Sequence, residues 1–132
     1  MLRGTSTVNS RQQFELIDIT TEIAAALREA AIADGICRIY NPHTTAGLTI
    51  NEGADPAVRD DLIAALRRMV PDLPYRHQEG NSPAHMMASL IGSSVTVFIA
   101  DGRLQLGTWQ RIFFAEFDGP RRRKIHWRFS PD

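Results

Sequence analysis

Hydrophobic and polar positions alternate with a period of two along residues 41–56, "NPHTTAGLTINEGADP", as in a β-strand. One face of this predicted strand carries the apolar residues Ala46, Leu48 and Ile50. The opposite face carries His43, Thr45, Gly47, Thr49 and Asn51. The apolar face is typical of a strand that packs on a core, so the polar face is free to line a pocket.

A period near 3.6 replaces this alternation in three other stretches. Residues 20–34 predict a helix that is capped by Thr20 or Thr21 and that Gly35 ends in a left-handed conformation. Residues 56–70 predict a second helix, with Asp55 as N-cap and a buried stripe of Val58, Leu62, Leu66 and Met69. Residues 83–91 predict a short third helix capped by Ser82.

Most of the remaining chain alternates like β-structure. Strands are predicted at 1–11, 14–19 and 36–41, and β-structure from residue 94 to the end, including a hairpin turn at Asp101-Gly102. "KIHWRF" places Ile125, Trp127 and Phe129 inward and His126 outward. We therefore predict one α+β domain over residues 1–132, with mostly antiparallel sheet, two long helices and one short helix.

Composition narrows the classes of function. The 132 residues hold 15 Lys+Arg and 15 Asp+Glu, so the net charge of zero argues against a general nucleic-acid binder and leaves a homo-oligomer open. The single cysteine, Cys37, lies in an apolar run and is predicted to be a buried core thiol. No signal-like segment or membrane-spanning run is present, so a cytoplasmic protein without membrane contact is expected.

Three of the four histidines lie in or beside polar, glycine-containing segments: His43, His77 and His85. Neutral imidazoles with a carboxylate such as Glu79 are typical ligands of a catalytic metal that keeps one position open. The first turn of the third helix would disfavour the charged form of His85 and leave its lone pair available. The alternative is that these histidines only form hydrogen bonds in a wet loop.

"EGNSPAH" supports a different ligand, an anion, because a helix N-terminus after a flexible glycine presents unpaired N–H groups. Predicted cationic or polar partners of a phosphate are Thr44, Arg59, Arg76 and Arg121. Each arginine has a simpler interpretation as part of a solvated helix face or turn. Asp55 is likewise favoured as a helix cap over a catalytic group.

Three ordered motifs resemble those of the YjbQ-like family, small proteins often labelled secondary thiamine-phosphate synthases. The motifs are "HTTAGLTINEGADPAVRDDL", "YRHQEGNSPAHMMASLIGSS" and "DGRLQLGTWQRIFFAEFDGPRRR", which together span nearly the whole chain. The resemblance implies an α+β fold that forms a homotrimer with a pocket near a subunit boundary. It also implies that hydroxymethylpyrimidine diphosphate and a thiazole phosphate are joined, with release of pyrophosphate.

The same resemblance implies roles for particular residues. His43, His77 and His85 would bind the metal, and the pocket would be surrounded by Asn51, Glu52, Asp55, Glu79, Asn81 and Gln110. The chain departs from the family where Pro83 replaces an acid and Met87 replaces a lysine. These departures leave the histidines intact but remove charges beside His85.

We therefore predict a trimeric metal-binding enzyme that acts on a phosphorylated small molecule, with weak or secondary thiamine-phosphate synthase activity. Glu79 or Glu52 would be the general acid/base, and Asn81, Gln110 and Arg59 would position the substrate. Three imidazoles favour zinc, whereas magnesium would accompany a diphosphate substrate. The alternative is a non-catalytic module that binds metal or a phosphometabolite.

Overall fold

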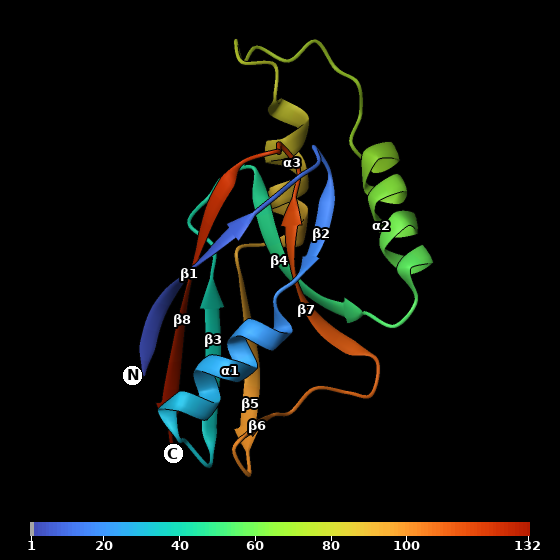
Figure 1. Ribbon diagram of the computed structural model, residues 1–132. Coiled ribbons are helices and arrows are strands. Elements are labelled where there is room, and N and C mark those ends of the chain that lie inside the picture. Colours follow the sequence, from blue (N-terminus) through green and yellow to red (C-terminus); the bar gives the residue numbers. More distant parts are fainter. Residues whose placement is uncertain (1) are drawn as a thin grey trace.

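The computed structural model describes residues 2–132, which form two antiparallel sheets and three helices (Figure 1). The five-stranded sheet has the order β1-β8-β3-β5-β6. Its strands are β1 (Arg3–Asn9), β8 (Arg122–Pro131), β3 (Gly35–Tyr40), β5 (Ser94–Ala100) and β6 (Arg103–Leu104). The three-stranded sheet has the order β2-β7-β4, with β2 (Glu15–Asp18), β7 (Gln110–Glu116) and β4 (Ala46–Glu52). The predicted α+β class is confirmed.

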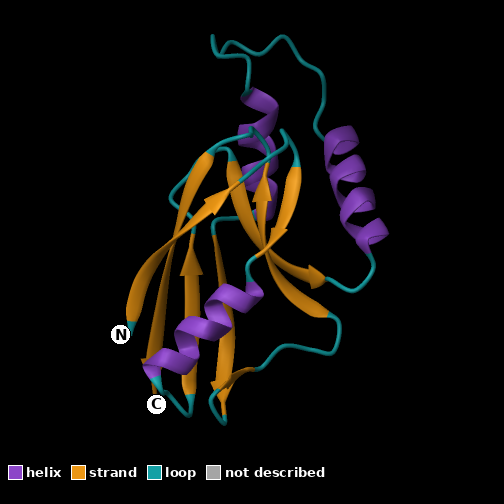
Figure 2. Cartoon of the chain, viewed as in Figure 1, coloured by secondary structure: helices purple, strands orange, loops and turns teal. Residues whose placement is uncertain are grey.

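The helices are α1 (Thr20–Ala30), α2 (Pro56–Met69) and α3 (Ser82–Ile91). Figure 2 shows α1 lying across the strands, with α2 and α3 beside the three-stranded sheet. No helix within residues 2–132 is both long and apolar enough to cross a membrane.

Strand β7 lies at the centre of the three-stranded sheet and is buried on both faces. Ile112 and Phe114 pack into a core shared with α1 and the five-stranded sheet, while Phe113 and Ala115 pack beneath α2 and α3. A strand covered on both sides needs apolar residues at successive positions, which explains the run "IFFA". The β7 strand therefore divides the protein into two hydrophobic layers.

Helix α1 ends at Ala30, four residues earlier than the predicted end at residue 34. Ala31 takes the left-handed position with φ of 55°, and its N–H donates to the carbonyls of Leu27 and Arg28. The next residue, Ile32, is buried in the core, so the chain leaves the helix there. Gly35 instead opens β3, where an added Cβ would lie 2.3 Å from the carbonyl oxygen of Ser130.

The predicted start of α2 is confirmed, but its buried stripe is narrower than predicted. The Asp55 carboxylate accepts a hydrogen bond of 2.9 Å from the Ala57 N–H. Leu66 is buried, whereas Met69 is 65% exposed at the end of the helix. Helix α3 begins at Ser82, which the sequence predicted to be the cap. Asn81 holds the N-cap position and makes no side-chain capping bond.

The hairpin turn is confirmed, since Asp101 and Gly102 both have positive φ, of 53° and 73°. The chain after this turn does not stay in one strand. Strand β6 ends at Leu104, and residues 110–116 join the other sheet as β7. In β8, Ile125 and Phe129 are buried and His126 is exposed, as predicted.

Candidate functional site

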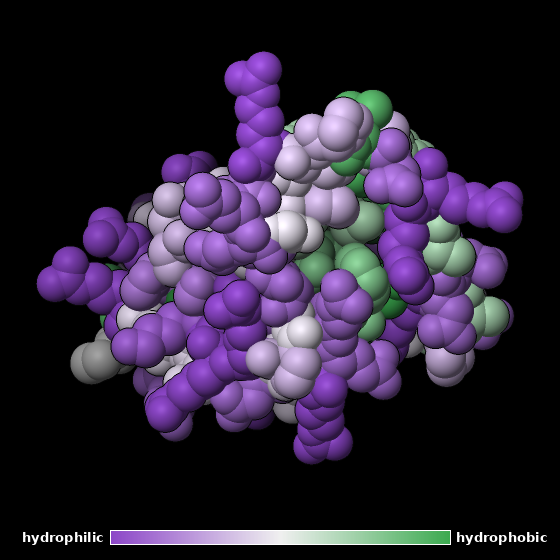
Figure 3. Space-filling model, turned by 90° about the horizontal axis from the view of Figure 1, so that it is seen from above, coloured by the Kyte–Doolittle hydropathy of each residue, from purple (hydrophilic) through white to green (hydrophobic). Residues whose placement is uncertain are grey.

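A cavity of about 420 Å³ lies where the segment before β4, the loop before α3 and the turn before β8 meet. It is lined by Pro42, His43, Thr44, Thr45, His77, Glu79, Asn81, His85, Asp118, Arg121 and Arg123. The loop that carries His77 lies at the top of Figure 1. Figure 3 views the molecule from that side and shows mostly hydrophilic side chains around a smaller hydrophobic area.

Two of the predicted metal ligands are neighbours in this cavity. The ring centroids of His77 and His85 lie 5.4 Å apart, with the ring planes 81° apart. His77 is in the exposed loop and His85 is in the first turn of α3. The fold therefore brings together two imidazoles that are eight positions apart in the chain.

His43 lines the same cavity, and its ring contacts the backbone of Lys124. Its Nε2 lies 2.9 Å from the Lys124 amide nitrogen and 3.1 Å from the Lys124 carbonyl oxygen. In one neutral tautomer Nε2 accepts from the amide, and Nδ1 carries the proton. In the other, Nε2–H donates to the carbonyl and leaves the Nδ1 lone pair free, as is usual for a metal-ligating histidine.

The surroundings of His43 favour its neutral form. Burial lowers the pKa of this imidazole, and the positive charge of Arg123 lowers it further. The contact with the Lys124 backbone and the charge of Glu116 act in the opposite direction but do not reverse the shift. Because a metal binds only neutral imidazole, the lowered pKa favours the form of His43 that could bind an ion.

The wall of the cavity contains a buried ion pair between Arg123 and Glu116. The Arg123 side chain donates to both Glu116 carboxylate oxygens, with Nε 2.8 Å from Oε1, and Nη2 also donates to the Thr45 hydroxyl at 2.8 Å. Glu116 has no exposed surface, and Arg123 is 5% exposed. The pair therefore fixes Thr45, and with it the segment that carries His43, against β7 and β8.

Further donors complete the Glu116 site. The Ser10 hydroxyl donates to Oε1 at 2.7 Å, and the Asp118 N–H donates to Oε2 at 3.0 Å. Burial raises the pKa of Glu116, but these hydrogen bonds and the Arg123 guanidinium outweigh it, so the pKa is lowered overall. Glu116 is thus an anchored carboxylate, not a proton donor at neutral pH.

Asn81, Asp118 and Arg121 form a second polar group at the cavity. The Asn81 Nδ2 and the Arg121 Nη2 both donate to the Asp118 Oδ2, at 2.9 and 3.0 Å. The Asn81 Oδ1 is buried and has no hydrogen-bond partner within residues 2–132. A buried acceptor of this kind needs a donor, which a bound molecule or water can supply.

Four predicted site residues lie at the other end of β4, away from this cavity: Asn51, Glu52, Asp55 and Gln110. Seven strand residues separate the two ends by about 20 Å. There, Glu52 is opposite Gln110 in the sheet and accepts from the Asp55 N–H at 3.0 Å. The Gln110 Oε1 accepts from the Gly107 N–H at 2.8 Å.

The two remaining arginines also lie outside the cavity lining. Arg59 stacks over Phe113, with Cζ 4.8 Å from the ring centroid, and its Nη2 donates to the Gly53 carbonyl at 3.2 Å. Arg76 is exposed beside His77. Thr44 and Arg121, by contrast, line the cavity.

Several residues that shape the site were not predicted from the sequence: Ser10, Asn41, Glu116 and Asp118. Asn41 is 1% exposed, and its Oδ1 accepts from the His43 N–H at 2.9 Å. "NP" before His43 is a turn signal that could have identified Asn41. Glu116 within the apolar run "IFFAEF" was the other available signal, because a buried acid needs a partner.

The side chains of the cavity do not form a complete set of metal ligands. Among residues 2–132, no three His, Cys, Asp or Glu side chains are arranged to hold an ion. The elements of such a site are present as the adjacent His77 and His85, with His43 and Glu79 on the same cavity.

A sequence model described as UPF0047 protein YjbQ-like matches residues 4–132. The chain belongs to this family. The family membership predicted from the three motifs is thereby confirmed. YjbQ-like relatives include a UPF0047 protein of Methanocaldococcus jannaschii, 51% identical over 95% of this chain and 91% of that protein. Another is UPF0047 protein YugU of Bacillus subtilis, 50% identical over 90% of this chain and 92% of that protein.

Solved YjbQ-like structures share the fold. A Clostridium acetobutylicum protein, described as an uncharacterised conserved protein of the YjbQ/UPF0047 family, superposes with a TM-score of 0.93 at 45% identity. The match covers 96% of this chain and 98% of that one. A Sulfolobus solfataricus protein described as being of unknown function superposes with a TM-score of 0.92 at 30% identity, over 98% and 96% of the two chains.

Proposed function

We propose that this YjbQ-like protein uses a divalent transition metal to act on a phosphorylated small molecule in the histidine cavity. The observation that supports this proposal most directly is the 5.4 Å approach of His77 and His85 in a cavity that also receives His43, Arg121 and Arg123. Two adjacent imidazoles favour zinc or a similar metal. His43 or Glu79 would complete the set of ligands.

Cationic donors beside the histidines support an anionic substrate. Within residues 2–132, Arg123 forms hydrogen bonds through Nε and Nη2 only, so its Nη1 is free to donate to a ligand in the cavity that it lines. Arg121 contributes a second, half-exposed guanidinium. Helix α3 begins at the cavity, and the side chain of its N-cap, Asn81, makes no capping bond to the helix. Because Pro83 has no N–H and the Ala84 and His85 N–H groups donate to the Asn81 carbonyl, the Ser82 N–H is the first-turn donor left for a phosphate within residues 2–132.

The remaining cavity residues have roles that follow from their chemistry. Thr44 would donate a hydrogen bond to the substrate, and Glu79 would transfer a proton. The unpartnered Oδ1 of Asn81 would accept from a hydroxyl or amine of the substrate. A bound metal would supply Lewis acidity toward a phosphoryl oxygen or activate a water molecule.

Thiamine phosphate formation is one reaction that this proposal includes. Magnesium would then accompany the diphosphate substrate. Pro83 and Met87, which stand where the family often has an acid and a lysine, would remove charges near His85. A homotrimer belongs to the same proposal. Asn51, Glu52, Asp55 and Gln110 lie about 20 Å from the cavity of their own chain, so they would reach a cavity only across a subunit boundary. A non-catalytic module that binds metal or a phosphometabolite is the alternative.

Metal content tests the proposal directly. The purified protein is loaded with zinc and then dialysed against metal-free buffer. We expect the wild type to retain zinc, and His77→Ala and His85→Ala to lose it. His126→Ala is the matched control, because His126 is exposed and does not line this cavity. Equal metal content in all four proteins would refute the metal site.

A turnover assay separates the enzyme from the binding module. The protein is incubated with the two thiamine precursors and with simpler phosphomonoesters, in the presence of zinc or magnesium. Product that requires His77 and Glu79 supports the enzyme, whereas saturable binding without product supports the module. Light scattering gives the mass in solution, and a monomer would exclude a shared cavity.

A further inference from the structure

The five-stranded sheet has one face that packs on the core and one that is open. Residues such as Cys37, Ile39, Val97 and Ile125 point to the core. Alternate positions on β1, β8, β3 and β5 point the other way, and we call them the basic face: Arg3, Thr5, Thr7, Asn9, Arg122, Lys124, His126, Arg128, Ser130, Ile36, Arg38, Tyr40, Ser94, Thr96 and Phe98. Except for the half-buried Ile36, all are exposed.

Positive charge is concentrated on this basic face. It carries five Lys and Arg side chains and no Asp or Glu. Strand pairing places Arg3 opposite Arg128 and Arg128 opposite Arg38, so three guanidinium groups form one row across three strands. Like charges directly opposite each other are unfavourable, and no acid within residues 2–132 forms a salt bridge with any of the three. The chain therefore has a cationic surface although its net charge is zero, because the acidic residues lie elsewhere.

Exposed aromatic rings lie on either side of this arginine row. Phe98 is 68% exposed and is opposite Ile36, while Tyr40 is 51% exposed and is opposite Ser94 and His126. Arg38 lies between them on β3, and its Nε donates to the Thr96 hydroxyl at 3.4 Å. A sheet face that places aromatic rings beside guanidinium groups suits stacked bases joined by phosphates.

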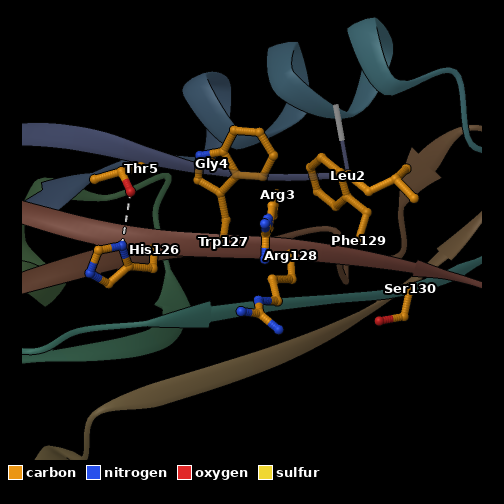
Figure 4. A pocket seen from close by; sticks show the side chains of 9 residues that line it. All are labelled: Leu2, Arg3, Gly4, Thr5, His126, Trp127, Arg128, Phe129 and Ser130. Carbon is orange, nitrogen blue, oxygen red and sulfur yellow. Dashed lines mark hydrogen bonds between the residues drawn. The ribbon is translucent and has the colours of Figure 1, made fainter.

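A hollow of about 850 Å³ along β1 and β8 includes residues of this face, among them Arg3, Thr5, His126 and Arg128. Figure 4 shows Trp127 and Phe129 pointing from β8 toward α1, while Arg128 points to the opposite side. Gly4 permits this packing, because a Cβ there would lie 2.2 Å from the Trp127 ring. The two aromatic residues of β8 thus pack against the core, whereas the cations of the same strand face solvent.

We propose that the basic face binds single-stranded RNA, with Arg3, Arg38 and Arg128 on phosphates and with Phe98 and Tyr40 stacked on bases. The hydroxyls of Thr5, Ser94 and Thr96 would contact the ribose 2′-OH. A second copy of the chain packed face to face here would set arginines against arginines, so charge complementarity favours the polyanion. The proposal does not depend on the histidine cavity.

Fluorescence anisotropy with a labelled oligouridine of about twelve nucleotides tests this inference. We expect binding by the wild type that weakens with salt. The double variant Arg38→Glu/Arg128→Glu should abolish it, and neutral Arg38→Gln/Arg128→Gln should reduce the salt slope by about 1.4, since each single-strand phosphate contact contributes about 0.7. Phe98→Leu should weaken binding by about 5-fold or more through lost stacking.

The single variant Arg38→Glu has Arg68→Glu as its matched control, because Arg68 is exposed on α2, away from the sheet, and the two substitutions change the net charge equally. Arg68→Glu should retain most of the affinity. Binding that Arg68→Glu reduces as much as Arg38→Glu would overturn the site, as would no binding by the wild type. The alternative occupant of the basic face is a second copy of the chain. Light scattering of the same variants tests this, because a change of mass caused by Arg38→Glu would assign the face to self-association. Tighter binding of the equivalent DNA would overturn the choice of RNA.

Discussion

The two ends of strand β4 carry similar residues but use them differently. At its start, Thr45 accepts from the buried Arg123, and His43 and Thr44 line a cavity. At its end, Glu52 and Asp55 accept hydrogen bonds that shape the turn into α2. The first end thus holds polar groups against a cavity, whereas the second uses them to form local backbone structure.

The difference comes from what covers each part of the strand. Gly47 lies beneath α3, where an added Cβ would be 2.8 Å from Ile91, so the middle of the polar face is packed, not open. Only His43 and Thr45 of the predicted polar face reach the cavity. The elements that pack over β4 therefore decide which of its polar residues line the cavity and which are buried or form turns.

Removing Arg123 should have the largest effect on stability and would show how far the cavity end depends on its ion pair. Arg123→Met leaves Glu116 charged and buried without its partner, which we expect to cost about 3–5 kcal/mol in chemical denaturation. Arg121→Met removes a half-exposed pair with Asp118 and should cost about 1 kcal/mol or less. Equal losses in the two variants would contradict the special role of Arg123.

Lowering the pH should reduce the stability that the Arg123–Glu116 pair gives to the cavity end of β4. The pKa of Glu116 is lower in the folded protein than its usual 4.5, so its contribution to stability is present above that pH and is lost as pH falls below it. The melting temperature should therefore drop on acidification. Replacing Glu116 with glutamine should flatten this part of the profile, and an unchanged profile would show that other carboxylates control it.

Asp55→Ala tests the distal end. Loss of the N-cap should destabilise the protein by about 1 kcal/mol in urea titration. Metal retention should not change if the residue acts only as a cap. If Asp55→Ala keeps its stability but loses turnover, the residue serves a cavity in a neighbouring subunit instead.

The histidine variants should have the smallest effect on stability. His77 is exposed in a loop, so His77→Ala should change the free energy of unfolding by less than about 0.5 kcal/mol without metal. With zinc present, the wild type should gain thermal stability and the variant should not. A large loss without metal would assign His77 a structural role.

Local chemistry allowed much of the fold to be predicted from the sequence. Asp55 before Pro56 marked the start of α2, Asp101-Gly102 marked a hairpin turn, and alternation in β8 identified its buried side. Cys37 was predicted to be buried, and it has no exposed surface, with burial raising its pKa to about 12. These features depend on neighbours in the chain, so the order of residues is sufficient.

The sequence did not predict which candidate site residues would share the cavity and which would lie at the far end of β4. His43, His77 and His85 meet at one cavity, whereas Gln110 joins the far end of β4 because β7 leaves the hairpin for the other sheet. The Arg123–Glu116 pair depends on β8 and β7 belonging to different sheets that approach near Thr45. Sequence spacing gives no measure of such contacts.

The sequence by itself determined the family, through its three motifs. It also determined the start of α2, the hairpin turn and the sidedness of the strands, because these follow from capping, short-range sterics and hydrophobic period. Tertiary structure alone decided which polar residues share a cavity and which arginines lie together on an exposed sheet face. Those outcomes depend on strand pairing across the whole chain, where residues that are distant in order become neighbours and identical side chains meet different surroundings.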